Sequence, residues 1–270
     1  MLDDRLRSFL REDFSIEWTD VGNEIAAGTD CRANVIAREK GLVAGVREVE
    51  VLYDILDVET DVQVHDGGYV KEDDEVLEVQ GDAASVLRGE RLALNLMGSM
   101  SGIATVTRQL VDRSEETVVA GTRKTTPGFR DFEKRAVKLG GGDPHRLDLS
   151  DMVMVKENHI EVLGLEVAMG KAVRESSYTS KVEVEAETIG QAVKASELGA
   201  DIVLLDNMSP KKVKKAIETL EDHDVLIEVS GGVWFDNVED YALDGVDVVS
   251  IGGLVHSSEW LDYSMRVSNG

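Results

Sequence analysis

The sequence predicts an α/β protein in which an N-terminal α+β module precedes a parallel β-sheet or barrel. From residue 117 onward, short apolar segments alternate with helix-like segments at intervals of roughly 20–30 residues, the spacing of successive βα units. Before that point, helical patterns are mixed with short alternating strands. Apolar residues are 42% of the 270 residues and aromatic residues only 5%, so aliphatic side chains must fill the core. A chain of this length forms one large domain or two smaller ones. We expect two, residues 1–103 and 104–270, with the last residues able to pack back on the first domain.

The first module begins with a helix and continues with short strands. Residues 1–20 carry leucines at helical spacing, and residues 48–56 show a second helical pattern. Residues 33–46 are β-branched and interrupted by glycine. Residues 61–81 alternate between apolar and polar side chains around the turn Asp66-Gly67-Gly68, which is typical of short antiparallel strands.

Residues 83–114 form the expected junction between the modules. Their apolar residues recur at helical spacing, and we expect two helices that meet near Gly98–Gly102. The longest uncharged run of the chain, Leu92–Thr107, lies inside this segment. It is too short and too polar to span a bilayer.

The second module is predicted to contain six strands and the helices between them. The expected strands are Thr117–Ala120, Met152–Val155, Lys181–Val184, Ile202–Leu205, Val225–Val229 and Asp247–Ile251. The expected helices between the later strands are 188–198, 210–220 and 237–243. Pro210 after Ser209 suits a helix start, with proline in the first turn and serine as N-cap.

Polar side chains and glycines follow each of these strands. In chain order they are Arg123 and Lys124, then Lys156, Glu185, Asp206, Ser230-Gly231-Gly232 and Gly252-Gly253. Because βα folds bind ligands at the C-terminal ends of their strands, we expect these residues to form one site.

The cations of this set lie in a window that differs in charge from the rest of the chain. Residues 121–159 hold 8 Lys and Arg against 6 Asp and Glu, whereas the whole chain holds 29 against 53. The candidate anion-binding residues of this window are Arg123, Lys124, His145, Arg146 and Lys156. Arginine recognises carboxylates in a bidentate way and lysine supplies a movable charge, so the window predicts a pocket for a small polyanion.

Two carboxylates at adjacent strand ends predict a magnesium site. Glu185 and Asp206 would face the basic pocket, where carboxylates suit Mg²⁺ that holds a diphosphate, directly or through water. Structural roles remain open, because Glu185 could pair with a pocket lysine and Asp206-Asn207 could cap the next helix. Glu183 replaces Glu185 as the pocket residue if the register differs by two.

The glycine pairs Gly231-Gly232 and Gly252-Gly253 predict a phosphate grip, because backbone amides there are free of side-chain obstruction. Ordinary loop geometry is the simpler reading of a single pair, but two pairs follow consecutive strands. The sequence has neither a P-loop nor a Gly-x-Gly-x-x-Gly motif after a strand. ATP hydrolysis and dinucleotide binding are therefore not expected.

The formal charge of −24 argues against binding to nucleic acid or to an anionic membrane, because both need a basic face. The negative charge is spread along the chain, which favours a protein adapted to high salt; an acidic protein indifferent to salt is the alternative. The N-terminus has no apolar signal segment, so we expect a cytoplasmic protein. Cys31 is the single cysteine, which excludes an intramolecular disulfide and a cysteine zinc site.

The window GTRKTTPGFRDFEKRAVKLGGGDPHRLDLSDMVMVKENH closely resembles the core signature of the quinolinate phosphoribosyltransferase family. The resemblance continues through GERLALNLMGSMSGIAT, VEVEAET, IVLLDNM, EVSGG and SIGGLVHS, and it covers roughly residues 48–257 in order. The N-terminal LRED also resembles the start of the family, whereas residues 16–31 depart from its usual pattern.

The resemblance implies an α+β N-terminal module packed on an open, incomplete α/β barrel of parallel strands. It implies that quinolinate and phosphoribosyl pyrophosphate react to give nicotinate mononucleotide, CO₂ and pyrophosphate, with Mg²⁺ required, a step in NAD biosynthesis. It also implies a homodimer or dimer-based hexamer, in which the N-terminal module completes the active site of its neighbour.

The resemblance also assigns roles to individual residues. Those matching the quinolinate-binding set are Arg123, His145, Arg146 and Lys156, with Lys124 beside them and Arg91 reaching in from the partner subunit. Those near the ribose and the metal are Glu185 and Asp206. Those matching the 5′-phosphate loops are Ser230, Gly231, Gly232, Gly252 and Gly253. Lys124, Glu185 and Asp206 are the expected catalytic residues, and His159 is expected to order its loop.

Three alternatives remain open from the residues. One is a relative on the same scaffold that uses another pyridine or heterocyclic acid. A second is an aldolase-type enzyme with a Schiff base on Lys156 or Lys124, which would need a lysine of lowered pKa. The third is an anion-binding module without catalysis, which Glu185 and Asp206 argue against.

Overall fold

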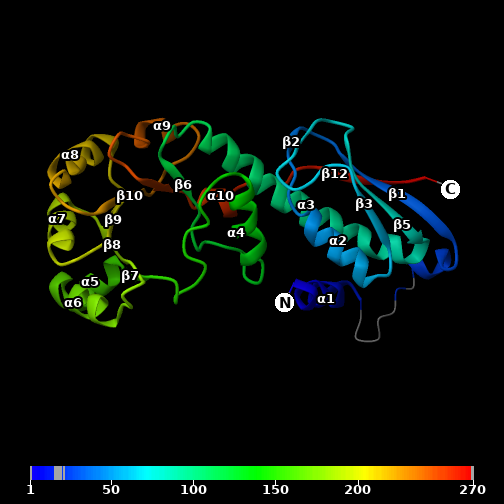
Figure 1. Ribbon diagram of the computed structural model, residues 1–270, viewed down its shortest axis with the longest axis horizontal. Helices are drawn as coiled ribbons and strands as arrows, with labels where there is room; N and C mark the ends of the chain where they lie inside the picture. The colour runs from blue at the N-terminus through cyan, green and yellow to red at the C-terminus, as the bar shows by residue number, and fades with distance from the viewer. Residues whose placement is uncertain (1, 15–19, 21, 269–270) are drawn as a thin grey trace. The chain divides into compact units, whose positions relative to one another are not determined.

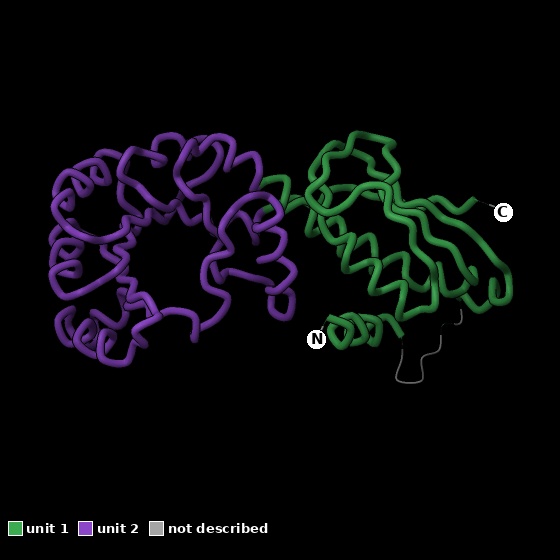
Figure 2. The backbone as a smooth tube through the Cα atoms, in the orientation of Figure 1, with its two compact units in different colours: residues 1–106, 258–270 green, residues 107–257 purple. Residues whose placement is uncertain are grey.

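The computed structural model describes residues 2–14, 20 and 22–268, and it divides into two compact units. Unit 1 contains residues 1–106 together with 258–270, and unit 2 contains residues 107–257 (Figure 2). The division falls at 106/107, against the boundary of 103/104 expected from the sequence, and it assigns residues 258–270 to unit 1. Among the described residues, no helix combines the length and apolar character needed to cross a membrane.

Unit 1 is built on a four-stranded antiparallel sheet in the order β12-β1-β5-β3 (Figure 1). Its strands are β1 (Asp30–Ala37), β3 (Glu59–Val62), β5 (Glu75–Asp82) and β12 (Tyr263–Ser268). A small ladder pairs β2 (Gly41–Leu42) with β4 (Tyr69–Val70). The strand at the end of the chain, β12, pairs with β1 across the register Met265↔Val35. The C-terminal segment therefore completes the sheet of unit 1.

The helices of unit 1 are α1 (Leu2–Asp13), the short 3₁₀ helix η1 (Asn23–Ala26), α2 (Val46–Ile55) and most of α3 (Ala83–Val111). Helix α1 contacts α2 and buries Leu6 and Leu10, the leucines at helical spacing. It ends at Asp13, earlier than the expected helix over 1–20, of which residues 1 and 15–19 lie outside the described part of the chain.

The expectation of two helices meeting near Gly98–Gly102 is wrong, because α3 is one continuous helix of 29 residues. The two glycines serve close packing instead. A Cβ on Gly102 would lie 2.0 Å from the carbonyl oxygen of Glu259, and one on Gly98 would lie 3.0 Å from that of Leu261. Glycine is thus required where the C-terminal segment crosses α3, and not as a helix breaker.

Unit 2 is an open barrel of six parallel strands in the order β6-β11-β10-β9-β8-β7. The strands are β6 (Val118–Ala120), β7 (Val153–Val155), β8 (Val182–Ala186), β9 (Ile202–Asp206), β10 (Leu226–Ser230) and β11 (Val248–Ser250). Each lies within two residues of its expected bounds. β6 and β7 are the two ends of the strand order, so the barrel is open between them, as the fold class inferred from the sequence requires.

The helices of unit 2 connect these strands, and α5 to α9 lie on the outer side of the curved sheet (Figure 1). They are α4 (Arg130–Leu139), α5 (Glu157–Leu163), α6 (Leu165–Glu175), α7 (Ile189–Glu197), α8 (Pro210–Leu220), α9 (Val238–Tyr241) and α10 (Gly253–His256). Helix α8 begins at Pro210 as expected, but the Ser209 side chain makes no capping hydrogen bond. Helix α7 is capped by Thr188, whose side chain accepts from the backbone N–H of Gln191 at 3.2 Å.

Candidate active site

A cavity of about 530 Å³ lies at the C-terminal ends of the strands of unit 2. The expected anion-binding residues that line it are Arg123, Lys124, His145, Arg146 and Lys156. The expected sugar-phosphate and metal residues that line it are Glu185, Asp206, Ser230, Gly231 and Gly232. Of the described residues expected in the site, only Arg91, Gly252 and Gly253 do not line this cavity. The fold therefore gathers residues that are up to about a hundred positions apart in the sequence, as ends of parallel strands do.

The strand register places the acidic residues on the inner face of the barrel. Glu185 lies beside Leu204 on β9, and Asp206 lies beside Ser230 on β10. Side chains alternate along a strand, so Leu204 and Asp206 share one face, and their neighbours in the parallel ladder share it too. Glu183 shares this face with Glu185 but is fully buried beneath the cavity. Glu185, and not Glu183, is therefore the glutamate of β8 that lines it.

The backbone of the loop that carries Arg123 and Lys124 is held by hydrogen bonds to the nearby side chains of Glu133 and Thr122. The buried carboxylate of Glu133 on α4 accepts from the backbone N–H of Thr126 at 3.0 and 3.3 Å. Burial raises the pKa of Glu133, while its hydrogen bonds to Thr126 act in the opposite direction. The backbone N–H of Lys124 donates to Thr122 Oγ1 at 3.1 Å. These contacts fix the path of the loop and so the direction of its two cations.

The turn that carries His145 and Arg146 has an unusual backbone. His145 has φ of 55°, in the left-handed region that few residues other than glycine adopt. Its N–H donates to Asp143 Oδ1 at 2.6 Å, and the buried Lys134 on α4 donates to the carbonyl oxygen of Pro144. Burial lowers the pKa of Lys134 to about 8, and Asp143 opposes this shift.

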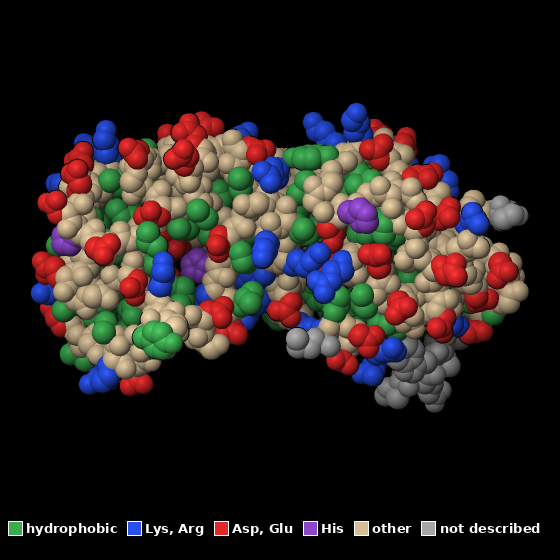
Figure 3. Space-filling model, in the orientation of Figure 1, with side chains coloured by type: hydrophobic (Ala, Val, Ile, Leu, Met, Phe, Trp, Pro, Cys, Tyr) green, Lys and Arg blue, Asp and Glu red, His purple; other side chains and the backbone are tan. Residues whose placement is uncertain are grey.

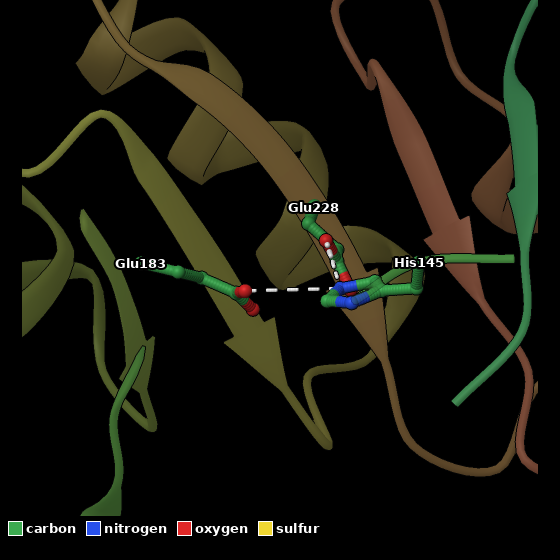
Figure 4. A group of neighbouring side chains, drawn as sticks. All are labelled: His145, Glu183 and Glu228. Atoms are coloured by element: carbon green, nitrogen blue, oxygen red, sulfur yellow. Dashed lines mark ion pairs between the residues drawn. The ribbon is translucent and has the colours of Figure 1, made fainter. Parts of the chain in front are cut away.

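The side chains of His145, Glu183 and Glu228 form a cluster (Figure 4), of which His145 and Glu228 line the cavity and Glu183 does not. His145 Nε2 is 3.4 Å from Glu228 Oε2 and 3.7 Å from Glu183 Oε2. Burial and the charge of Glu228 raise the pKa of Glu183 to about 8. Burial by itself lowers the pKa of His145, but its hydrogen bond to Glu228 and the two carboxylate charges bring it above the usual value. Glu228 was not singled out from the sequence, although a charged residue inside the apolar strand LIEVS is a visible signal.

Lys156 and Glu185 form an ion pair at the edge of the cavity. Burial raises the pKa of Glu185, as does a hydrogen bond with Glu157, while Lys156 lowers it. Pairing with a lysine was one of the structural roles left open for Glu185, and here it occurs within the cavity itself. His159 Nδ1 accepts from the backbone N–H of Lys156 at 3.0 Å, which orders the start of α5.

Asp206 does not cap the next helix, because α8 begins at Pro210 with Ser209 in the N-cap position. Its Oδ2 instead accepts from Asn207 Nδ2 at 2.8 Å. Asn207 has φ of 53°, lines the cavity and was not predicted as a site residue. Its Oδ1 would lie 2.3 Å from a Cβ on Gly231, which itself has φ of 98°. Glycine is therefore required at 231 by both conformation and space.

In the second glycine pair, Gly252-Gly253, a side chain would meet a different neighbour at each position. A Cβ on Gly253 would lie 2.6 Å from the ring of Trp234, so this glycine allows close packing. A Cβ on Gly252 would lie 3.0 Å from Lys124 Cδ and 3.5 Å from Lys124 Nζ. Lys124 therefore extends from the cavity to the turn at Gly252.

Arg91 lies exposed on α3 in unit 1.

The residues present suit a bound Mg²⁺ ion. Glu185 and Asp206 offer carboxylate oxygens from neighbouring strands to a cavity that has room for phosphate oxygens. Magnesium in phosphate-binding sites takes one or two protein carboxylates, completed by water and by the substrate. The donor set is thus of the hard oxygen type that this ion prefers.

Comparison with known proteins places the site in a family. The model described as "Quinolinate phosphoribosyl transferase, C-terminal domain" matches residues 103–266, and the model of the N-terminal domain matches residues 13–101. A probable nicotinate-nucleotide pyrophosphorylase [carboxylating] of Archaeoglobus fulgidus is 47% identical over 247 residues, which are 88% of this chain and 95% of that protein. The human nicotinate-nucleotide pyrophosphorylase [carboxylating] is 35% identical over 267 residues, which are 96% of this chain and 89% of that protein.

Solved structures agree with this placement. The crystal structure of NadC from Streptococcus pyogenes matches with a TM-score of 0.92 and 36% identity, covering 99% of this chain and 96% of that one. The nicotinate-nucleotide pyrophosphorylase of Francisella tularensis matches with a TM-score of 0.91 and 33% identity over 99% and 96% of the two chains. Sequence, fold and cavity thus agree, and the chain belongs to the quinolinate phosphoribosyl transferase family.

Proposed function

We propose that the protein is a quinolinate phosphoribosyltransferase, which makes nicotinate mononucleotide, CO₂ and pyrophosphate from quinolinate and phosphoribosyl pyrophosphate in NAD biosynthesis. The observation that carries the proposal is the composition of one cavity. Basic side chains from the segment 121–156 and carboxylates with glycine loops from β8, β9 and β10 line the same space. This pairing suits a dicarboxylic acid beside a sugar phosphate, and curated relatives of this chain carry the name of this enzyme.

The basic side of the cavity is the proposed binding place for quinolinate. Arg123 and Arg146 offer planar guanidinium groups for its two carboxylates, and Lys156 adds a movable charge. Met154 and Leu204 are apolar side chains of the same lining and suit the flat pyridine ring. The carboxylates are thereby held while the ring nitrogen is left free to attack the sugar.

The opposite set of residues is the proposed binding place for the sugar phosphate. Ser230, Gly231 and Gly232 offer a hydroxyl and backbone N–H groups to the 5′-phosphate. Lys124 reaches from the cavity toward Gly252, so its ammonium suits a phosphate oxygen in that region. Glu185 and Asp206 would hold Mg²⁺, which supplies charge stabilisation for the pyrophosphate as it leaves.

The residues suggest how the reaction proceeds. The quinolinate nitrogen bonds to the ribose carbon as the bond from that carbon to pyrophosphate breaks, and the carbon develops positive charge. The carboxylates of Glu185 and Asp206 can offset this charge. The pyridinium ring then accepts the electron pair of its adjacent carboxylate as CO₂ leaves, and a proton takes its place on the ring carbon. No covalent bond to the protein is required.

The ion pair of Lys156 argues against the Schiff-base alternative. A Schiff base requires an amine that is free to attack a carbonyl carbon, and Lys156 Nζ is instead held in an ion pair with Glu185. Borohydride treatment with a carbonyl substrate is therefore expected to leave the protein unmodified.

A direct assay tests the proposed function. Purified protein is incubated with quinolinate, phosphoribosyl pyrophosphate and Mg²⁺, and CO₂ and nicotinate mononucleotide are measured. We expect both products in equal amounts. Turnover with nicotinate instead of quinolinate, without CO₂, would identify a relative of different substrate and contradict the proposal.

A further inference from the structure

The cluster of His145, Glu183 and Glu228 contains two buried carboxylates that the proposed chemistry does not use. Glu183 is fully buried and Glu228 is 2% exposed. Both oxygens of Glu183 and Oε1 of Glu228 have no hydrogen-bond partner among the described residues. Burying an ionisable group without partners is costly, so such groups persist where they serve a purpose. The remaining oxygen, Glu228 Oε2, faces His145.

The His145 ring connects these carboxylates to the backbone of Arg146. Its Nδ1 accepts from the N–H of Arg146 at 2.8 Å, and its Nε2 faces Glu228 and Glu183 (Figure 4). A nitrogen that accepts a hydrogen bond carries no proton, so Nε2 is the nitrogen that donates. Both ring nitrogens are thus engaged by the protein, one to the barrel interior and one to the residue that follows.

The backbone of His145 needs such support. Its left-handed φ of 55° is unfavourable for a residue with a Cβ and persists where the surroundings hold it. Without the carboxylates, the ring loses the contact that fixes its orientation and the turn is free to relax. The guanidinium of Arg146, which donates to Met154 Sδ at 2.9 Å, would then leave the position from which it faces the cavity.

We propose that Glu228, assisted by Glu183, is a positioning residue that acts through His145 to hold Arg146 in the pose that binds a substrate carboxylate. The inference rests on the proposed function, because it assumes that Arg146 binds quinolinate. It predicts an effect on quinolinate that is separate from any effect on phosphoribosyl pyrophosphate. Ser230, a proposed phosphate-binding residue, ends the same strand, but its hydroxyl donates to the carbonyl oxygen of Ser250 at 3.4 Å.

The test compares Glu228→Ala with Glu228→Gln in the full-length protein. We expect Glu228→Ala to raise KM for quinolinate roughly tenfold to a hundredfold, the range for a lost hydrogen bond to a charged group. KM for phosphoribosyl pyrophosphate is expected to change little. Glu228→Gln is expected to restore most of the affinity, because its amide oxygen still accepts from Nε2. Equal rises in both KM values, or no rescue by glutamine, would overturn the proposal.

A double-mutant comparison tests whether the effect passes through His145. In a His145→Ala background, Glu228→Ala is expected to cause no further rise in KM for quinolinate, because the connection is already broken. Independent, multiplying effects would overturn the proposal. Should Glu228→Ala fail to fold, Glu228→Asp keeps the charge but withdraws it by one methylene, and a several-fold rise in KM for quinolinate is then expected. An unchanged KM in Glu228→Asp would count against the role.

Two controls separate the possible failures. Ser114→Ala removes a buried hydroxyl of unit 2 that donates to the carbonyl oxygen of Leu110 and does not line the cavity. This variant is expected to leave both KM values unchanged. A wild-type protein that does not use quinolinate refutes the proposed function, whereas normal wild-type kinetics with an unaffected Glu228→Ala variant refute only the positioning role. The three side chains also offer ligand atoms within 4.8 Å of one another, so metal content is measured. A stoichiometric metal ion that is lost in His145→Ala would overturn the inference.

Discussion

At the scale of single residues, charge of both signs is placed within one cavity. Arg123, Arg146 and Lys156 stand against Glu185 and Asp206, and Lys156 already pairs with Glu185. Such a site binds an anion by exchanging an internal partner for the ligand, which favours substrates that carry several charges at fixed positions.

The first prediction concerns Arg123. Arg123→Ala removes a guanidinium that offers two parallel hydrogen bonds to a carboxylate, so kcat/KM for quinolinate should fall by about 100-fold or more. Steady-state kinetics measure this loss, with Arg174→Ala, at an exposed position on α6, as the control. Wild-type kinetics in Arg123→Ala would contradict its proposed role.

The second prediction concerns the buried Lys134. Its pKa is lowered to about 8 from 10.5, so between these values the unfolded chain binds more protons and this lysine's contribution to stability rises with pH. The free energy of unfolding of the wild type, minus that of Lys134→Met, should therefore increase by about 1–2 kcal/mol from about pH 7 to about pH 9.5. Urea unfolding measures it. Lys138→Met, at an exposed position on the same helix, should show no such change.

Residue types and spacing predicted most of the cavity, because each βα unit ends at the same edge of the barrel. Strand ends and the family signature were enough to name six of its residues, which are Arg123, His145, Arg146, Lys156, Glu185 and Asp206. Glu228 could not, since a strand end was taken as the place for function and Glu228 lies two residues earlier, inside β10. Asn207 was missed for a related reason, because its left-handed backbone and its closeness to Gly231 exist only in the folded chain.

At the scale of elements, the positions of strands were easier to predict than whether a helix continues through its glycines. The six strands of unit 2 have apolar runs bounded by polar turns, and local sequence determines them. Gly98 and Gly102 carry no local sign that distinguishes a helix break from a crossing point, since both uses require glycine. The segment that crosses α3 there, Glu259–Leu261, is far away in the sequence.

The third prediction follows from that crossing. Gly102→Ala places a Cβ 2.0 Å from the carbonyl oxygen of Glu259, and backbone on both sides prevents an easy adjustment. We expect a loss of stability of about 2–4 kcal/mol or failure to fold, as for other overpacked sites. Gly170→Ala is the matched control on α6, because nothing lies within 4 Å of its Cβ. It should stabilise the protein slightly through helix propensity. Thermal unfolding compares the two; equal melting temperatures would contradict the packing argument.

At the scale of the whole molecule, the negative charge does not form one patch on the face that Figure 3 shows. Acidic side chains are spread over the visible face, with few places where lysine and arginine gather (Figure 3). The chain carries 53 acidic and 29 basic side chains. Repulsion among so many carboxylates opposes compaction unless salt screens it.

The fourth prediction is a dependence on salt. We propose that the protein is adapted to high salt, so its melting temperature and its activity should rise as potassium chloride is increased from about 0.1 M toward molar concentration. Full stability and activity at the lowest concentration would contradict this adaptation.

The fifth prediction concerns assembly. We propose that the protein forms a homodimer, or a hexamer built from such dimers, in which Arg91 enters the active site of the neighbouring subunit. Arg91→Ala and Lys156→Ala should each be inactive alone. Mixing them should restore about a quarter of the wild-type activity. About half of the randomly formed dimers contain one subunit of each variant, and in these dimers one site carries both defects while the other site is intact. Subunit exchange is verified by mass spectrometry. No recovery after verified exchange would argue against shared sites.

The pairing of β12 with β1 has a consequence for how the chain is made. Unit 2 is continuous in sequence, whereas the sheet of unit 1 receives its edge strand only from residues 263–268. During synthesis the ribosome releases these residues only after those of unit 2, so β1 waits with an open edge while the whole barrel is translated. Truncation of the last strand by an early stop codon would leave that edge exposed in every molecule. Nascent chains should accordingly depend on chaperones until residues 263–268 have left the ribosome.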